Sequence, residues 1–339
     1  IAVMPNLNSE ASSRAIVFEA LTEAKGEIVS SARLTKLLSS TRQAVFKAVC
    51  ALKEEGVPIE SIPQKGYRIT DVEEIDALSP TMIEHFLREN PIFNKCIYLK
   101  ETDSTQKVIK KAALRDEAAG LVAVTDLQTG GRGRRGRLWE SPSGKNLMFS
   151  MLLRPELKPG EVQLLNLAAG IAVKETLREL CNVPAELKWP NDILCSGKKI
   201  CGILSEASGE PDRIYYAVTG VGLNVNMGRE DIPADLSDTA TSLFIEGGKV
   251  FPRWRLLVDF LNRFADMMML LSRKDGTAEL LSLYRSKCDT IGQRVRVVSD
   301  DEEITGVACN ITDEGAIVVR GNMRDRVFAA ADVFHLRNA

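Results

Sequence analysis

Apolar positions near the N-terminus recur three or four residues apart, the spacing of a helix with one buried face. Three helices and then two short extended segments are predicted after a loose terminus at 1–12: residues 13–24, 31–38 and 42–55, then 58–62 and 66–69. The second helix is expected to bury Leu34, Leu37 and Leu38. Three helices followed by a hairpin predict a winged helix-turn-helix domain over residues 1–72.

The outward face of the third predicted helix carries residues suited to nucleic acid. It presents Thr41, Arg42, Gln43, Phe46 and Lys47, and such a helix would enter the major groove of DNA. Residues 1–70 hold nine Lys/Arg and seven Asp/Glu, a net charge of 9 − 7 = +2, against −2 for the whole chain. A winged helix that binds another protein remains the alternative, since this small fold serves both purposes.

Beyond an acidic linker at 71–80, the pattern becomes mixed α/β and then all-β. Ser79 and Pro80 predict the start of a helix. Further helices are expected at 101–113, 164–180 and 252–271, and strands at 97–99, 121–126, 146–153, 200–206 and 215–226. From Ile291 onward four short strands are separated by turns: 294–299, 303–311, 316–320 and 326–329. About fifty residues of this kind predict a small barrel of SH3-like size. The fold class is therefore α+β and multidomain.

Composition narrows the class of protein. With 339 residues, 45% hydrophobic and 27% charged, the chain is long enough for two or three domains. No apolar run approaches the ~20 residues that span a bilayer, so no membrane partner is expected. Seven scattered cysteines without a Cys-x-x-Cys pair indicate reduced thiols and a cytoplasmic location, and argue against disulfides or zinc. Only two histidines are present, which disfavours histidine-based catalysis.

The segment from Gly130 to Arg137 contains four glycines and four arginines in eight residues. Arginine forks and bare backbone suit a phosphate or carboxylate. The glycine spacing matches a dinucleotide-binding fingerprint, but the loop lies between two predicted strands rather than between a strand and a helix, so that interpretation fails. The loop also lacks the companion motifs of a protein kinase. A solvated basic loop or an RNA-binding tract remains open.

Other residues also indicate a ligand. Lys188 lies among apolar residues in Leu187-Lys188-Trp189-Pro190-Asn191-Asp192-Ile193, where a charge is costly unless an anion meets it. Gly220 and Gly222 fall inside a predicted strand, which indicates a bulge or a ligand on the backbone. Ser104 and Thr105 open a predicted helix, either as caps or as ligand contacts.

Five motifs in this order resemble those of the bifunctional biotin protein ligases that also repress the biotin biosynthesis operon, over about residues 13–337. They are Asp103-Ser104-Thr105, Gln128-x-x-Gly131-Arg132-Gly133-Arg134-Arg135-Gly136-Arg137-x-Trp139, Lys188-Trp189-Pro190-Asn191-Asp192, Gly202-Ile203-Leu204-x-Glu206 and Gly220-x-Gly222-x-Asn224. Two positions depart from the family: Gln106, where the family commonly has Asn, and Ser39, where the turn often has Gly.

The resemblance implies three domains: a winged helix at 1–72, a class II synthetase-like catalytic domain at 73–286 and an SH3-like barrel at 287–339. It implies that biotin and ATP, with Mg²⁺ as counter-ion and no tightly bound prosthetic group, give biotinoyl-5′-AMP. Biotin then passes to a lysine of a biotin carboxyl carrier domain. Biotinoyl-AMP is also the expected corepressor, with a homodimer binding operator DNA.

The resemblance also assigns residues. Catalysis is expected from Lys188, Arg134 and Arg132. Biotin contacts are expected from Ser104, Thr105, Gln106, Gln128, Arg132, Gly133, Arg134, Lys188, Gly202 and Leu204. Nucleotide contacts are expected from Trp139, Gly220, Gly222 and Asn224, and no metal ligand is identified. The competing hypothesis is a DNA-binding regulator that senses biotin or a nucleotide without turnover.

Overall fold

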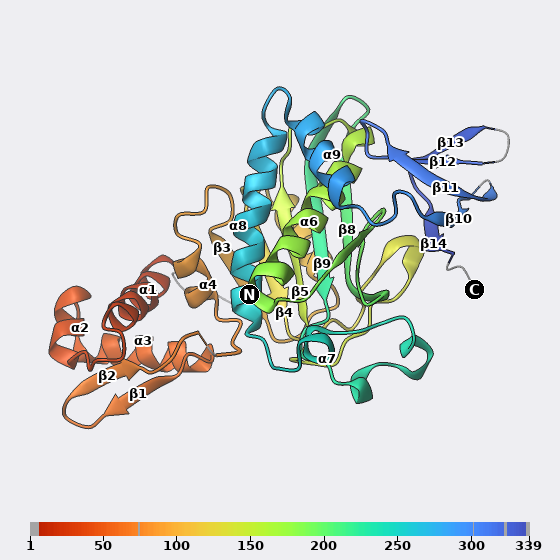
Figure 1. Ribbon diagram of the computed structural model, residues 1–339. Coiled ribbons are helices and arrows are strands. Elements are labelled where there is room, and N and C mark those ends of the chain that lie inside the picture. Colours follow the sequence, from red (N-terminus) through yellow and green to blue (C-terminus); the bar gives the residue numbers. More distant parts are fainter. Residues whose placement is uncertain (1–6, 74, 301, 322–323, 337–339) are drawn as a thin grey trace.

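Three parts follow one another along the chain, and Figure 1 shows them from the N-terminal helices to the C-terminal sheet. The computed structural model describes residues 7–73, 75–300, 302–321 and 324–336. Within them, no helix is long and apolar enough to cross a membrane.

The N-terminal part is a three-helix unit with a hairpin. Its elements are α1 (Leu7–Glu23), α2 (Ser31–Leu37), α3 (Arg42–Glu54), β1 (Ile59–Ile62) and β2 (Gly66–Ile69). The winged helix-turn-helix predicted from the sequence is confirmed, although α1 already begins at Leu7. The expectation of a loose segment at 7–12 was therefore wrong, and residues 1–6 lie outside the described residues. Leu34 is fully buried, whereas Leu37 is exposed, because only one face of the short α2 meets the core.

The turn between α2 and α3 depends on Ser39, which has φ +46°. This is the left-handed region, which glycine adopts without a steric cost, so a glycine would be favoured at this position. Thr41 then caps α3, its hydroxyl accepting a hydrogen bond from the Ala44 N–H at 3.2 Å.

A seven-stranded sheet forms the centre of the molecule. Its order is β3 (Lys95–Leu99), β4 (Leu121–Thr125), β5 (Leu147–Leu153), β9 (Arg213–Leu223), β8 (Lys198–Glu210), β7 (Asp192–Cys195) and β6 (Glu186–Lys188). Only β3 and β4 run parallel, and the other neighbours are antiparallel. Every residue of β5 is buried, because helices cover both faces of the sheet.

The covering helices divide between the two faces. Helix α5 (Thr105–Ala113) packs on one face through Ile109, against Ala123 and Val218 of the sheet. The other face is covered by α6 (Gln163–Thr176), α8 (Arg253–Leu271) and α9 (Gly276–Lys287), as Figure 1 shows. The sequence pattern missed α9 and the short α7 (Leu243–Gly247).

The C-terminal part is a small antiparallel sheet, as predicted. Its order is β13 (Asp325–Phe328), β12 (Ile317–Arg320), β11 (Glu303–Ile311), β10 (Arg294–Val298) and β14 (Asp332–His335). The sequence pattern missed β14, which has only four residues, Asp-Val-Phe-His, without an alternation of polar and apolar positions. By pairing with β10, this strand brings Asp332 and Phe334 to the lining of the central part's cavity.

The winged helix is packed against the central part and is not merely tethered to it. Phe18 of α1 is fully buried and meets the rings of His85 and Phe86 edge-on at 5.1 and 6.4 Å between centroids. Phe86, at the end of α4 (Pro80–Phe86), stacks on Trp254 of α8 at 4.8 Å. An apolar contact of this kind fixes the orientation of the N-terminal part.

Phe18→Ala should lower the free energy of unfolding by about 3–5 kcal/mol, because it leaves a cavity in this aromatic cluster. Phe46→Ala is the matched control, since Phe46 is 59% exposed and its loss should change stability by less than about 0.5 kcal/mol. Chemical denaturation of both variants measures the difference. Equal stabilities would contradict the packing described here.

Candidate functional site

A single cavity of about 690 Å³ brings the predicted ligand residues together. It lies over β5, β8 and β9, beneath the loop from 128 to 140, and it reaches the C-terminal sheet. Its lining includes every residue predicted to contact biotin or the nucleotide: Ser104, Thr105, Gln106, Gln128, Arg132, Gly133, Arg134, Trp139, Lys188, Gly202, Leu204, Gly220, Gly222 and Asn224. Five motifs far apart in the sequence therefore share one cavity.

The start of α5 forms a polar network at one side of the cavity. Gln128 Oε1 accepts hydrogen bonds from the Thr105 N–H at 2.8 Å and the Thr105 hydroxyl at 3.1 Å. The Thr105 hydroxyl also lies 2.7 Å from the Ser150 hydroxyl. Ser104 is the N-cap residue, yet its hydroxyl makes no capping bond. The sequence left Ser104 either as a helix cap or as a ligand contact, and the structure does not show it capping the helix.

Gln106 and Gly220 lie in contact beside this network. The Gln106 amide donates to the Leu204 carbonyl at 2.7 Å, which ties α5 to β8. A Cβ atom at Gly220 would come within 2.8 Å of Gln106 Nε2. Glycine at this position leaves space for the Gln106 side chain, which lies directly against the strand.

Two paired glycines face the Trp139 indole. Gly202 and Gly222 are register partners in β8 and β9. A Cβ atom would lie 3.1 Å from the Trp139 ring at Gly202 and 2.6 Å from it at Gly222. The indole therefore rests on bare strand backbone, and Lys199 Nζ lies 5.7 Å from its ring centroid. The Trp139 Nε1–H is buried and has no hydrogen-bond partner among the described residues.

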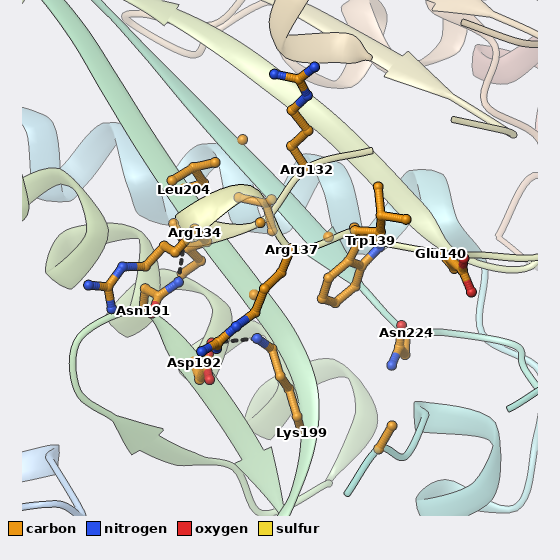
Figure 2. Close-up of a pocket in the computed structure, with 18 of the residues that line it drawn as sticks. Arg132, Arg134, Arg137, Trp139, Glu140, Asn191, Asp192, Lys199, Leu204 and Asn224 are labelled. Atoms are coloured by element: carbon orange, nitrogen blue, oxygen red, sulfur yellow. Dashed lines mark hydrogen bonds and ion pairs between the residues drawn. The ribbon is translucent and has the colours of Figure 1, made fainter. Parts of the chain in front are cut away.

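Arg132 and Arg134 of the glycine loop point in different directions. Figure 2 shows the Arg132 side chain pointing away from Arg134, which is directed towards Asn191. Arg134 donates to Asn191 Oδ1 at 3.4 Å and to the Ala331 carbonyl at 3.1 Å. Burial lowers the pKa of Arg134. Arg132, Arg134 and Lys188 therefore line the same cavity, but Arg132 points away from Arg134 in this structure.

The other two arginines of the loop reach the C-terminal sheet. Arg137 forms an ion pair with Asp332, and Arg135 pairs with Asp300 and, at 3.5 Å, with Asp332. Asp332 lines the cavity and its side chain is 11% exposed. No local pattern indicated this contact, because the partners lie almost two hundred residues apart.

Lys188 ends β6 with its ammonium in the cavity. In the described part of the chain this ammonium has no hydrogen bond or ion pair, and the Phe334 ring lies 5.9 Å away. Burial lowers the pKa of Lys188, and the carboxylate of Asp192 offsets the effect in part. A cation in this setting favours any anion that enters the cavity.

The C-terminal part also fixes the backbone beside Lys188. The Trp189 N–H donates to the Thr290 hydroxyl at 3.0 Å, and the Trp189 indole donates to the Gly315 carbonyl at 2.8 Å. Thr290 and Trp189 are both fully buried. Sequence reasoning missed Thr290, which no local pattern distinguishes.

Asn224 is held at the far side by protein groups. Its Oδ1 accepts from Asn146 at 3.3 Å, and its amide donates to the Thr241 carbonyl at 2.9 Å. One amide hydrogen and one lone pair remain for a ligand. Lys199 and Asp192, paired at 2.6 Å, also line the cavity (Figure 2). Sequence reasoning assigned neither a role, although Asp192 closes the Lys188 motif.

Comparisons with known proteins cover the whole arrangement. Family models described as "Biotin/lipoate A/B protein ligase family", "HTH domain" and "Biotin protein ligase C terminal domain" match residues 98–224, 14–68 and 290–336. The bifunctional ligase/repressor BirA of Bacillus subtilis is 32% identical over 321 residues, which cover 94% of this chain and 97% of that protein. The chain belongs to the biotin protein ligase family.

Two further relatives agree with this assignment. The biotin--[acetyl-CoA-carboxylase] ligase of Mycobacterium tuberculosis is 34% identical, with 77% of this chain and 98% of that protein covered. A solved structure of the Aquifex aeolicus biotin protein ligase in complex with biotin and ATP matches with a TM-score of 0.64 at 32% identity. That match covers 73% of this chain and 100% of the other.

The face of α3 that was predicted to bind DNA lies on the surface of this biotin protein ligase. Arg42, Gln43, Phe46 and Lys47 are all exposed on α3. Thr41 is exposed too, but its hydroxyl is engaged in capping α3. The face is therefore free to meet a partner along most of its length.

Gly222→Ala should displace the Trp139 indole, because the added methyl group would meet the ring. We expect the tryptophan emission to shift to longer wavelength, since Trp189 and Trp254 stay buried, and the free energy of unfolding to fall by about 1–3 kcal/mol. Gly160→Ala is the control, because nothing lies within 4 Å of its added Cβ atom. Identical emission spectra for both variants would show that the indole does not rest on Gly222.

Proposed function

We propose that this biotin protein ligase joins biotin to AMP at the cavity and then transfers biotin to a lysine of a biotin carboxyl carrier domain. The observation that carries the proposal is the Lys188 ammonium, which lies in the cavity and, among the described residues, has no hydrogen bond or ion pair. A carboxylate and a phosphate repel each other, so a site that brings them together needs cations. ATP and biotin are the substrates, and both are bound in the similar Aquifex aeolicus ligase.

In the proposed first step, a biotin carboxylate oxygen attacks the α-phosphorus of ATP. The P–O bond to the β-phosphate breaks, pyrophosphate leaves, and biotinoyl-5′-AMP forms. Lys188 and Arg134 offset the charge that gathers on the reacting oxygens. Arg132 would join them if the glycine loop moved its side chain inward. No covalent enzyme intermediate is needed.

The cavity suggests where each part of the substrates lies. Ser104, Thr105 and Gln128 offer hydroxyl and amide groups to the ureido ring of biotin. The strand from Gly202 to Leu204 offers an apolar surface to its tail. Trp139 would stack on adenine, and the free groups of Asn224 would meet its edge.

The proposed second step consumes the mixed anhydride. The neutral amine of a carrier lysine attacks the acyl carbon, the bond to the AMP oxygen breaks, and an amide forms with loss of a proton. AMP leaves as a stable phosphate. Lys188 and Arg134 would stabilise this leaving group as they stabilise the first transition state.

Mg²⁺ is expected to accompany ATP as its counter-ion. Among the described residues no group of three or more His, Cys, Asp or Glu side chains could hold a metal ion. Two cavity carboxylates, Asp192 and Asp332, are already paired with Lys199 and Arg137. We infer that the phosphates supply most of the ligands, as is common for Mg²⁺ on nucleotides.

The winged helix supports a second role, repression of biotin genes with biotinoyl-AMP as corepressor. A two-fold operator would be bound by a homodimer that forms when biotinoyl-AMP is present. A non-catalytic regulator that only senses biotin or a nucleotide is the alternative. Release of pyrophosphate from biotin and ATP distinguishes the two, because only the ligase produces it.

Lys188→Met should reduce adenylate formation by on the order of 10²–10³, because one cation of the anion site is lost. Lys158→Met, at an exposed position, is the control and should keep the parental rate. Pyrophosphate release measures both. A near-parental rate for Lys188→Met would contradict the role of this cation.

The same variant should also change how stability depends on pH. The folded pKa of Lys188 lies below its ordinary value of 10.5, so between these two values the unfolded chain holds more protons than the folded one. The contribution of Lys188 to the free energy of unfolding therefore becomes more favourable as the pH rises through that window. Below the window, the charged ammonium destabilises the folded protein without ligands. Lys188→Met should remove this contribution and be no less stable than the parent near neutral pH.

Arg42→Ala and Lys47→Ala should each weaken operator binding and lower its salt dependence by about one phosphate contact. The measurement is a gel-shift titration with biotin and ATP present at several salt concentrations. Arg115→Ala, at an exposed position of the central part, should bind as the parent does. Parental salt dependence in both α3 variants would exclude this face from the DNA contact.

A further inference from the structure

Arg253, the first residue of α8, is a charged side chain inside the molecule, with 4% of its surface exposed. Its Nε lies 2.9 and 3.0 Å from the two carboxylate oxygens of Asp76, and its backbone N–H donates to Asp76 at 3.0 Å. Asp76 belongs to the segment that joins the winged helix to the central part. One side of the Arg253 guanidinium is therefore bound to the linker through Asp76.

The other side of the same guanidinium holds two strand ends. Nη1 donates to Asp126 Oδ1 at 2.7 Å and to the Asn146 carbonyl at 3.2 Å. Asp126 follows β4, and Asn146 precedes β5. Tyr98 donates its hydroxyl to the second oxygen of Asp126 at 2.5 Å. The carboxylate is thus fixed from two directions.

Each strand end leads directly to a cavity residue. Asp126 lies two residues before Gln128, which holds the start of α5 through Thr105. The Asn146 side chain donates to Asn224 and accepts from the Val225 N–H at 2.9 Å. Arg253 is therefore connected through Asp126 to Gln128 and through Asn146 to Asn224, which are proposed above to contact biotin and the nucleotide.

We propose that Arg253 is a positioning residue that couples the linker at Asp76 to the two sides of the ligand cavity. The proposal rests on the proposed function only in that biotin and ATP are the ligands of this cavity. A buried guanidinium shared by two carboxylates cannot lose one of them without reorganising around the other, because an unpaired buried charge is costly. Displacement of the linker then shifts Asp126 and Asn146, and ordering of Gln128 and Asn224 by ligands holds the linker in place.

The chain offers a matched control on the same linker and the same helix. Glu73 pairs with Arg255 at 3.2 Å, but both side chains are largely exposed, at 73% and 46%, and neither contacts a strand end. Glu73→Gln removes one linker charge from α8, as Asp76→Asn does. Only Asp76→Asn alters the group that reaches the cavity.

The first test compares steady-state adenylate formation in the full-length variants. Asp76→Asn should raise the KM for biotin and for ATP by about fivefold, within the usual range of coupling between sites, and leave kcat close to that of the parent, since Lys188 is untouched. Glu73→Gln should match the parent in all three quantities. Equal KM values for the two variants would overturn the proposal.

The second test reads the coupling in the opposite direction. In the parent, saturating biotin and ATP should slow hydrogen exchange of the backbone amides at residues 75–78, and this protection should be lost in Asp76→Asn but kept in Glu73→Gln. A merely structural role of Asp76 would alter exchange with and without ligand alike, and that result would overturn the proposal. Failure of the proposed function is recognised separately, because the parent itself would then release no pyrophosphate.

Discussion

The arrangement of this protein depends on a lysine ammonium that lies in the ligand cavity with no hydrogen bond or ion pair to any described residue. Lys188 has Leu187 and Trp189 on either side, both fully buried, and Phe334 beyond its tip. Burial of such a charge is unfavourable by itself, and the fold bears this cost at the place where two anionic substrates are proposed to meet. The arginines that line the same cavity are consistent with a site that admits anions.

The three parts of the chain contribute to this cavity unequally but jointly. The central sheet supplies the floor, with glycines at 202, 220 and 222 where the side chains of Trp139 and Gln106 approach the backbone. The C-terminal part holds the strand end beside Lys188 through Thr290, which precedes β10, and binds the arginine loop through Asp332 of β14. The winged helix packs on α4, which stacks on α8. Arg253 joins the linker to Asp126 and Asn146, which lead to Gln128 and Asn224. An enzyme and a DNA-binding unit are thereby connected through packed side chains.

Much of the fold and most of the cavity could be predicted from the sequence, because the signals were local. The spacing of apolar residues predicted the three N-terminal helices, and glycines inside a strand predicted a close approach to the backbone at Gly220 and Gly222. What the sequence could not show depends on contacts between distant segments. The contacts of Asp76 with Arg253 and of Trp189 with Thr290 join distant segments, so no local sequence pattern indicates them. Strand β14 was missed for the same reason, since four residues become a strand only when β10 lies beside them. The direction of the Arg132 side chain is likewise set by the loop's conformation rather than by its composition.

The most direct test of this account is the titration of the Lys188 ammonium itself. Selective ¹³C labelling of lysine, with the signal assigned by its loss in Lys188→Met, allows its pKa to be followed by NMR in the empty protein and with biotin and a non-hydrolysable ATP analogue bound. The account predicts a pKa below the ordinary value of 10.5 in the empty protein and a rise when the anions enter. An ordinary pKa that does not change on binding would contradict it, because the cation would then be neither desolvated nor in contact with the substrates.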